Sequence, residues 1–194
     1  MNATVSGRPF TVCVYCGSSA GADPQFMDQA ARLGAAMAQA GLALVYGGGD
    51  NGLMGAVARG VLENGGSVTG IIPQFLVAKE QPHGAERLLG ADIRIVADMH
   101  TRKHDMFQAA DAFVALPGGI GTLEEVIEML TWAQLRRHDK PVMLLNTAGF
   151  WDPLVDLLDH MEAAAFLHNA AAARPAVHAD VASLVSALRS AEAE

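Results

Sequence analysis

The sequence has few positive charges and no apolar run long enough to cross a membrane. Its 194 residues include 13 lysines and arginines against 21 aspartates and glutamates, a net charge of −8. Affinity for nucleic acid comes mainly from basic side chains that neutralise phosphates, so this balance argues against a nucleic-acid partner. No stretch approaches the roughly 20 apolar residues that span a bilayer, and the first residues lack the pattern of a signal peptide. We therefore expect a cytoplasmic protein that binds neither nucleic acid nor membrane.

Cysteine is also scarce, with only Cys13 and Cys16 in the chain. Their CxxC spacing would indicate redox chemistry at a helix N-terminus, where the helix dipole lowers the pKa of a thiol. Here the spacing falls in TVCVYC, which is typical of a strand, and residues three apart on a strand face opposite sides. We expect two ordinary buried cysteines.

Short apolar runs alternate with longer amphipathic stretches along a chain that is 51% hydrophobic and 18% charged. The predicted strands are Thr11–Cys16, Leu42–Tyr46, Ser67–Ile72, Asp92–Val96, Ala112–Leu116, Val142–Leu145 and Ala176–His178. The predicted helices are Pro24–Gln39, Leu53–Glu63, Arg102–Ala110, Thr122–Leu135, Asp152–Ala165 and a last one from the N-cap Asp180 to about Ala191. Strict alternation with continuous apolar strands predicts one α/β domain over residues 1–194, a parallel sheet covered on both faces.

Three turns rich in small residues follow predicted strands, at the edge where such sheets bind ligands. They are CGSS (Cys16–Ser19), GGGDNG (Gly47–Gly52) and PGGIGT (Pro117–Thr122). GGGDNG has the glycine spacing of a dinucleotide site, but the next strand ends in Pro73 without the acid that would hold a ribose hydroxyl. An NAD site is therefore weakly supported, and a tight turn with close packing needs the same glycines.

The PGGIGT turn lacks the lysine of a Walker A loop but can still hold a phosphate. Its glycines allow close approach, and the Thr122 hydroxyl and the free amides of the following helix can donate to phosphate oxygens without a metal. A plain glycine-rich turn is the alternative. We favour the anion site.

Carboxylates and cations gather around this turn. Glu124 and Glu125 stand in the expected first turn of the helix, where acids favour the dipole. The stripe expected to be buried on that helix is Val126, Ile127, Leu130 and Ala133. Glu125 lies at its margin, where burial would raise its pKa towards that of a base.

Arg102 and Lys103 begin the preceding predicted helix, where cations oppose the dipole. This placement indicates an anionic partner, either Glu125 or a ligand phosphate, with two solvated surface cations as the alternative. His100 and His104 are spaced as a metal pair, but nothing in the sequence completes a ligand set, so we expect no metal.

MHTRK (Met99–Lys103) followed by PGGIGTLEE (Pro117–Glu125) resembles the Lonely Guy (LOG) family, the cytokinin riboside 5'-monophosphate phosphoribohydrolases. CVYCGSS, LVYGGGDNGLMG, GIIP and TWAQLRRHDKPV extend the resemblance over nearly the whole chain. It implies a doubly wound, Rossmann-like sheet of about seven strands, a homodimer, and hydrolysis of the N-glycosidic bond of an adenosine-type 5'-monophosphate. The products would be the free base and ribose 5-phosphate. Relatives have often been labelled lysine decarboxylases, but no pyridoxal lysine site is visible and we expect no cofactor.

The resemblance also assigns residues by position. Arg102 and Glu125 match the catalytic pair of the family. The substrate-binding residues would be Glu80, Arg102, Lys103, Gly118, Gly119, Ile120, Gly121, Thr122, Leu123, Glu124 and Thr131. In this hypothesis the 5'-phosphate anchors the nucleotide, while Glu125 stabilises an oxocarbenium-like ribose and activates water.

Two other functions stay open at this point. The same architecture can serve a nucleotide-binding or carrier protein without catalysis, or a broader purine or pyrimidine monophosphate nucleosidase. The preference between adenine and an N6-prenylated adenine is also open. Met106, Met129 or Trp132 could line a prenyl pocket, although each is more often simple core.

Overall fold

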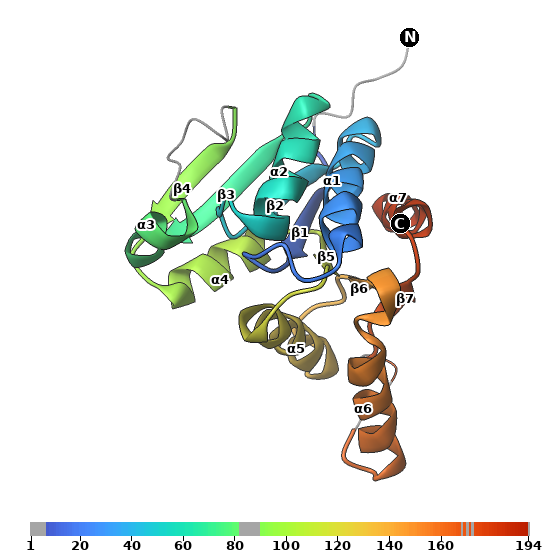
Figure 1. The fold of residues 1–194 in the computed structure, drawn as a ribbon. Coiled ribbons are helices and arrows are strands. Elements are labelled where there is room, and N and C mark those ends of the chain that lie inside the picture. The colour runs from blue at the N-terminus through green and yellow to red at the C-terminus, as the bar shows by residue number, and fades with distance from the viewer. Residues whose placement is uncertain (1–6, 82–89, 168, 170, 172, 194) are drawn as a thin grey trace.

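A computed structural model describes residues 7–81, 90–167, 169, 171 and 173–193. Its centre is a seven-stranded sheet of order β4-β3-β2-β1-β5-β6-β7, in which every pairing is parallel (Figure 1). The strands are β1 (Thr11–Tyr15), β2 (Ala43–Tyr46), β3 (Val68–Pro73), β4 (Asp92–Val96), β5 (Ala112–Ala115), β6 (Val142–Leu145) and β7 (Ala176–His178). Because the chain winds from β1 first to β2 and later to β5 on its other side, the switch point lies between β1 and β5. The predicted doubly wound α/β fold is confirmed.

Helices cover both faces of the sheet, and α6 reaches away from it (Figure 1). One face carries α1 (Pro24–Gln39), α2 (Gly52–Glu63) and α7 (Val181–Glu192), and the other carries α4 (Met99–Ala109), α5 (Ile120–Gln134) and α6 (Asp152–Ala163). The short α3 (Val77–Glu80) follows β3. Among the helices of the described residues, none has the length and apolar character needed to span a bilayer.

The core has two layers because successive residues of each strand face opposite sides. Val12 and Val14 of β1 pack under α1 and α2, while Cys13 and Tyr15 pack under α4 and α5. Both cysteines are buried free thiols, as predicted.

Two helix starts differ from the prediction by more than one residue. α4 begins at Met99, ahead of Arg102, because Asp98 caps it by accepting a hydrogen bond from the Thr101 amide at 2.8 Å. α5 begins at Ile120, after the N-cap Gly119, which has no side chain to announce it. Glu124 and Glu125 therefore lie beyond the first turn of α5, so the argument from the helix dipole was wrong for these two carboxylates, whereas Arg102 still stands at the end of the first turn of α4.

The predicted buried stripe of α5 is also partly wrong. Ile127 is 38% exposed, whereas Met129 is buried beside Val126 and Leu130. The helix packs on the sheet through the side that carries Met129, so Ile127 turns towards solvent.

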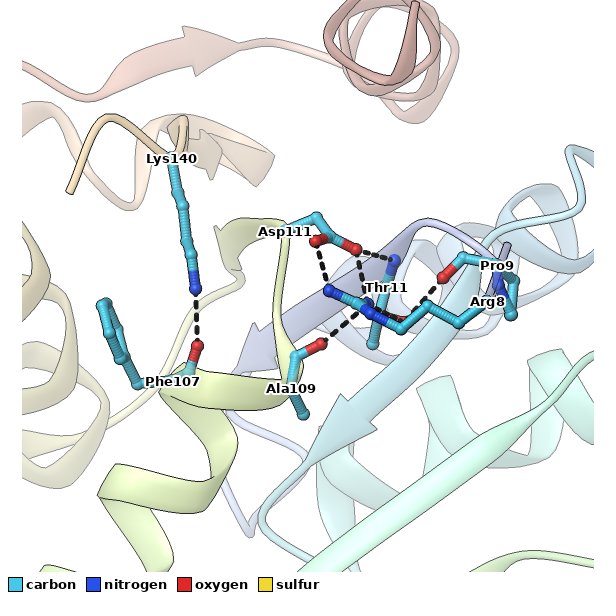
Figure 2. A network of polar contacts seen from close by, with 7 residues as sticks. All are labelled: Arg8, Pro9, Thr11, Phe107, Ala109, Asp111 and Lys140. Atoms are coloured by element: carbon cyan, nitrogen blue, oxygen red, sulfur yellow. Dashed lines mark hydrogen bonds and ion pairs between the residues drawn. The ribbon is translucent and has the colours of Figure 1, made fainter. Parts of the chain in front are cut away.

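At the amino edge of the sheet, Asp111 joins β1 to β5 (Figure 2). Its two carboxylate oxygens accept hydrogen bonds from Arg8 Nη1 and Nη2 at 2.7 and 2.6 Å, and the Thr11 amide donates to one of them at 2.9 Å. Nearby, Lys140 Nζ donates to the Phe107 carbonyl at 2.8 Å and lies 4.2 Å from the centre of its ring. These contacts fasten the ends of α4, β1, β5 and β6 together.

Candidate active site

A cleft of about 250 Å³ opens at the carboxyl edge of the sheet, beside the switch point. It lies among the turn after β1, the start of α2, the short α3, and the first turns of α4 and α5. Its lining residues are Cys16, Gly17, Ser18, Met54, Leu76, Glu80, Met99, Arg102, Gly119, Gly121, Thr122, Glu124 and Glu125. The predicted PGGIGT and CGSS turns thus meet in one site.

The glycine turn before α5 is shaped for close approach. The Gly17 amide donates to the Pro117 carbonyl at 3.1 Å, which joins the two turns. A Cβ on Gly118 would lie 2.2 Å from Thr122 Oγ1, so only glycine fits there. A Cβ on Gly119 or Gly121 would meet nothing within 4 Å, so both positions border open space.

The N-terminus of α5 faces this space without a side-chain cap. The Leu123 amide already donates to the Gly119 carbonyl, but helix geometry leaves the amides of Ile120, Gly121 and Thr122 without intrahelical partners. Such amides, aligned with the positive end of the helix dipole, form a ready site for an anion.

Glu125 stands one turn further along α5, half-buried against the cleft. Burial raises its pKa to about 7, with smaller contributions from Glu124 and Glu80, while the nearby Arg102 and Lys103 oppose the shift. A carboxyl group with this pKa exchanges a proton readily near neutral pH, as a general base or acid must.

Arg102 is only 7% exposed, yet its guanidinium is not saturated by hydrogen bonds. Nη1 lies 4.0 Å from Glu80 Oε2 and 3.9 Å from the Met99 sulfur, and Nε has no partner. A separation of 4.0 Å is too long for a direct hydrogen bond. Burial raises the pKa of Glu80, although Arg102 opposes that shift. Donors on Arg102 and an acceptor on Glu80 therefore stay available to a ligand.

Lys103, unlike Arg102, forms close ion pairs with carboxylates of the protein. Its Nζ donates to Glu124 Oε1 at 2.6 Å and to Glu128 Oε1 at 3.1 Å, which ties α4 to α5. Partial burial alone would lower the pKa of Lys103, but these two carboxylates raise it.

The structure gathers only some of the predicted site residues around the cleft. Glu80, Arg102, Gly119, Gly121, Thr122, Glu124 and Glu125 line it; Lys103, Gly118, Ile120, Leu123 and Thr131 are not among the lining residues. Thr131 lies on the exposed side of α5, where its hydroxyl donates to the Ile127 carbonyl at 2.7 Å.

Three apolar side chains that the sequence analysis did not single out also line the cleft. They are Met54, Leu76 and Met99, which the fold brings together from separate parts of the chain. Met106 and Met129 are instead core residues, 1% and 2% exposed, and Trp132 packs edge-on against Phe107 outside the cleft. Of the two alternatives left open for these residues, simple core is confirmed for the two methionines, and none of the three lines the cleft.

Comparison with known proteins agrees with these motifs. A family model described as "Possible lysine decarboxylase" matches residues 54–188. The chain is 47% identical over 148 residues to the cytokinin riboside 5'-monophosphate phosphoribohydrolase LOG1 of Arabidopsis thaliana, covering 76% of this chain and 68% of that one. This chain belongs to the LOG family. The rice enzyme LOG (Oryza sativa subsp. japonica) is 48% identical over 151 residues, and the match spans 60% of its length.

A solved structure shares the fold of this chain at lower sequence identity. The Moco carrier protein from Chlamydomonas reinhardtii matches 96% of this chain and 99% of its own, with a TM-score of 0.68 and 24% identity. Among the described lining residues there is no lysine to hold a pyridoxal cofactor.

Proposed function

We propose that this LOG-family protein hydrolyses the N-glycosidic bond of adenosine-type 5'-monophosphates, releasing the free base and ribose 5-phosphate. The observation that carries the proposal is the position of Glu125, a carboxyl group with a pKa raised to about 7, one helical turn beyond an amide-lined anion site. The names of the relatives LOG and LOG1 support the same reaction.

The 5'-phosphate would bind at the start of α5. The amides of Ile120, Gly121 and Thr122 and the Thr122 hydroxyl can donate to its oxygens, and the open sides of Gly119 and Gly121 leave room for it. Glu125 is then roughly 5 Å further along the helix axis, at 1.5 Å per residue, close to where the ribose must lie. Binding energy from an unreactive group would thus fix the reactive carbon against the carboxylate.

Glu125 would act on the anomeric carbon. As the C1'–N9 bond breaks, its electrons leave with the base and positive charge develops on the ribose, which an ionised carboxylate stabilises. A water molecule adds to C1' and gives one proton to Glu125, the departing base takes up a proton from solvent, and Glu125 then releases its proton to solvent, so that water is consumed and no net proton is gained or lost. Arg102 would orient Glu125 or the ribose and offset the negative charge of the site.

The apolar side chains in the cleft lining support a base that carries an apolar N6 substituent. Met54, Leu76 and Met99 line the cleft together with Glu80 and Arg102. A prenyl group gains from such contacts because its burial removes apolar area from water. We therefore expect an N6-isopentenyl nucleotide to be used better than AMP.

We also propose a homodimer, formed through α5. Ile120, Ile127 and Leu135 are 83%, 38% and 64% exposed, and the helical period places them along one side with Thr131. A monomer would leave this apolar stripe in water. Thr131 could then contact a substrate only in the partner's cleft. Sedimentation of the wild type should give a dimer, and Ile127→Glu should give a monomer; a wild-type monomer would contradict this assembly.

The decisive experiment measures base release from AMP and from isopentenyladenosine 5'-monophosphate, with the matching nucleosides as controls. We expect release from the monophosphates only, and its loss in Glu125→Gln with nucleotide binding retained. Binding without release by the wild type would contradict the hydrolase and favour a nucleotide carrier. Equal release from pyrimidine monophosphates would indicate a broader nucleosidase.

A further inference from the structure

The turn after β2 packs against the guanidinium of Arg102. Gly47, the first residue of GGGDNG, is buried directly beneath the guanidinium. A Cβ built on Gly47 would lie 1.9 Å from Arg102 Nη2 and 3.0 Å from Cζ. The backbone of Gly47 is not in the left-handed region, so an alanine could adopt its conformation. Space for Arg102, and not backbone freedom, is what requires glycine here.

The same turn also holds the segment that carries Glu80. The Asp50 amide donates to the Glu80 carbonyl at 2.9 Å, and Gln81 Nε2 donates to the Gly48 carbonyl at 2.6 Å. Arg102 and Glu80 lie 4.0 Å apart. Residues 47–50 therefore help to position both of them.

We propose that Gly47 is a positioning residue for the hydrolysis, which acts by leaving the Arg102 guanidinium its place beside Glu80 and Glu125. This inference rests on the proposed function. It gives the GGGDNG turn a role that needs no dinucleotide.

The steric clash that an alanine at position 47 would make differs from the clashes expected at other glycines. The atoms that an alanine would meet are the far end of a flexible side chain, so Arg102 can move and the fold need not. Gly60 offers a matched contrast, because a Cβ there would lie 2.4 Å from the Ala31 carbonyl oxygen, where α1 and α2 cross backbone to backbone. Gly47→Ala should therefore damage the site at little cost in stability, and Gly60→Ala should do the reverse.

Displacement of Arg102 has a second consequence. Arg102 is the first of the groups that lower the pKa of Glu125, so moving it away lets that pKa rise. The charged or titratable groups around Glu125 are Glu124 on its own helix, Arg102 and Lys103 on α4, Glu80 on α3, Cys13 and Tyr15 on β1, and Cys16 directly after β1. The acid limb of the pH profile should move to higher pH in Gly47→Ala and stay in place in Gly60→Ala.

The test is a double-mutant cycle of Gly47→Ala and Arg102→Lys, with Gly60→Ala as the control, read as kcat/KM, as the Kd for AMP and as Tm. A misplacement of about 1 Å costs on the order of 100-fold, so we expect that loss of kcat/KM in Gly47→Ala, with Tm near the wild type. In the Arg102→Lys background, which has no Nη2 to displace, the further loss from Gly47→Ala should be less than about two-fold. Gly60→Ala should lower Tm and leave kcat/KM of the folded enzyme unchanged.

Additive losses in the cycle, or a loss of activity in Gly47→Ala that merely follows a fall in Tm, would overturn the inference. Failure of the proposed function is a separate result. A wild type that binds AMP but releases no base removes the hydrolase, while the cycle can still be read in the Kd for AMP, where coupling supports the role of Gly47 and additivity refutes it.

Discussion

Each edge of the sheet carries an arginine and a carboxylate, but the two are hydrogen-bonded at the amino edge and separated at the carboxyl edge. At the amino edge, Arg8 and Asp111 meet in two bonds of 2.7 and 2.6 Å, and the Thr11 amide adds a third (Figure 2). At the carboxyl edge, Arg102 and Glu80 stand 4.0 Å apart, and both retain buried polar atoms without partners.

This difference separates stability from readiness to bind. A buried polar atom without a partner costs roughly 1–3 kcal/mol, so a fold built for stability alone would close the gap between Arg102 and Glu80. The amino edge shows that the same fold can close such a pair. Under the proposed function, the unpaired atoms of Arg102 and Glu80 are contacts kept for the nucleotide.

The most severe way to disturb the carboxyl edge is to remove its base. Glu125→Gln should lower kcat for base release by about 1,000-fold, because general base catalysis is lost while the phosphate site is untouched. Single-turnover kinetics with isopentenyladenosine 5'-monophosphate would measure this. Glu128→Gln, one turn further along α5 and outside the cleft lining, is the matched control; an equal loss there would contradict a special role for Glu125.

The pH profile should reveal the same carboxyl group. Since Glu125 must be ionised to act as a base and its pKa is about 7, kcat/KM should rise with pH and level off above neutrality. At pH 5 it should be about 100-fold below the plateau. A profile that falls as the pH rises from 6 to 8 would instead indicate that Glu125 acts as an acid.

The raised pKa of Glu125 should also make the free energy of unfolding depend on pH. Folding raises the pKa of Glu125 from 4.5 to about 7, so its ionisation favours the unfolded chain, and stability is lost between those pH values as the pH rises. Glu125→Gln does not undergo this loss and should be more stable than the wild type at pH 8 by about 3 kcal/mol. Urea unfolding at pH 8 and pH 5 measures the difference, which should shrink at pH 5; equal differences at both values would contradict the raised pKa.

A substitution at the amino edge should change the free energy of unfolding and not the activity, and this effect should be the smallest. Asp111→Ala removes the acceptor of three hydrogen bonds and should cost about 1 kcal/mol, with kcat/KM unchanged. Arg94→Ala breaks the ion pair with Asp92, whose side chains are more than half exposed, and serves as a control without measurable effect. Loss of activity in Asp111→Ala would break the proposed separation between the two edges.

The sequence predicted the fold well because its signals are local. Apolar runs separated by glycine turns placed every strand within one residue at each end, and the helices that begin at Pro24 and Asp152 start where predicted. The start of α5 was missed because Gly119 carries no capping side chain, and the outward turn of Ile127 depends on how α5 rotates against the sheet.

The site was predictable only in part for a similar reason. Glu125 and Thr122 follow from the PGGIGTLEE motif itself, whereas Met54, Leu76 and Met99 come from three separate elements and have no common pattern. Glycine is required at position 47 because Arg102 occupies the space where a side chain would lie. The two residues are far apart in the chain, so periodicity and spacing do not reveal this contact.

Gly119 and Gly121 carry a consequence for how this site can change over time. Because a Cβ at either position would meet nothing within 4 Å, packing within the folded chain does not require glycine there. Under the proposed function, it is the bound nucleotide that requires these two glycines, and a substitution such as Gly121→Val would then hinder the ligand while the fold stays intact. A descendant could in that way lose the proposed chemistry in one step and persist as a stable scaffold.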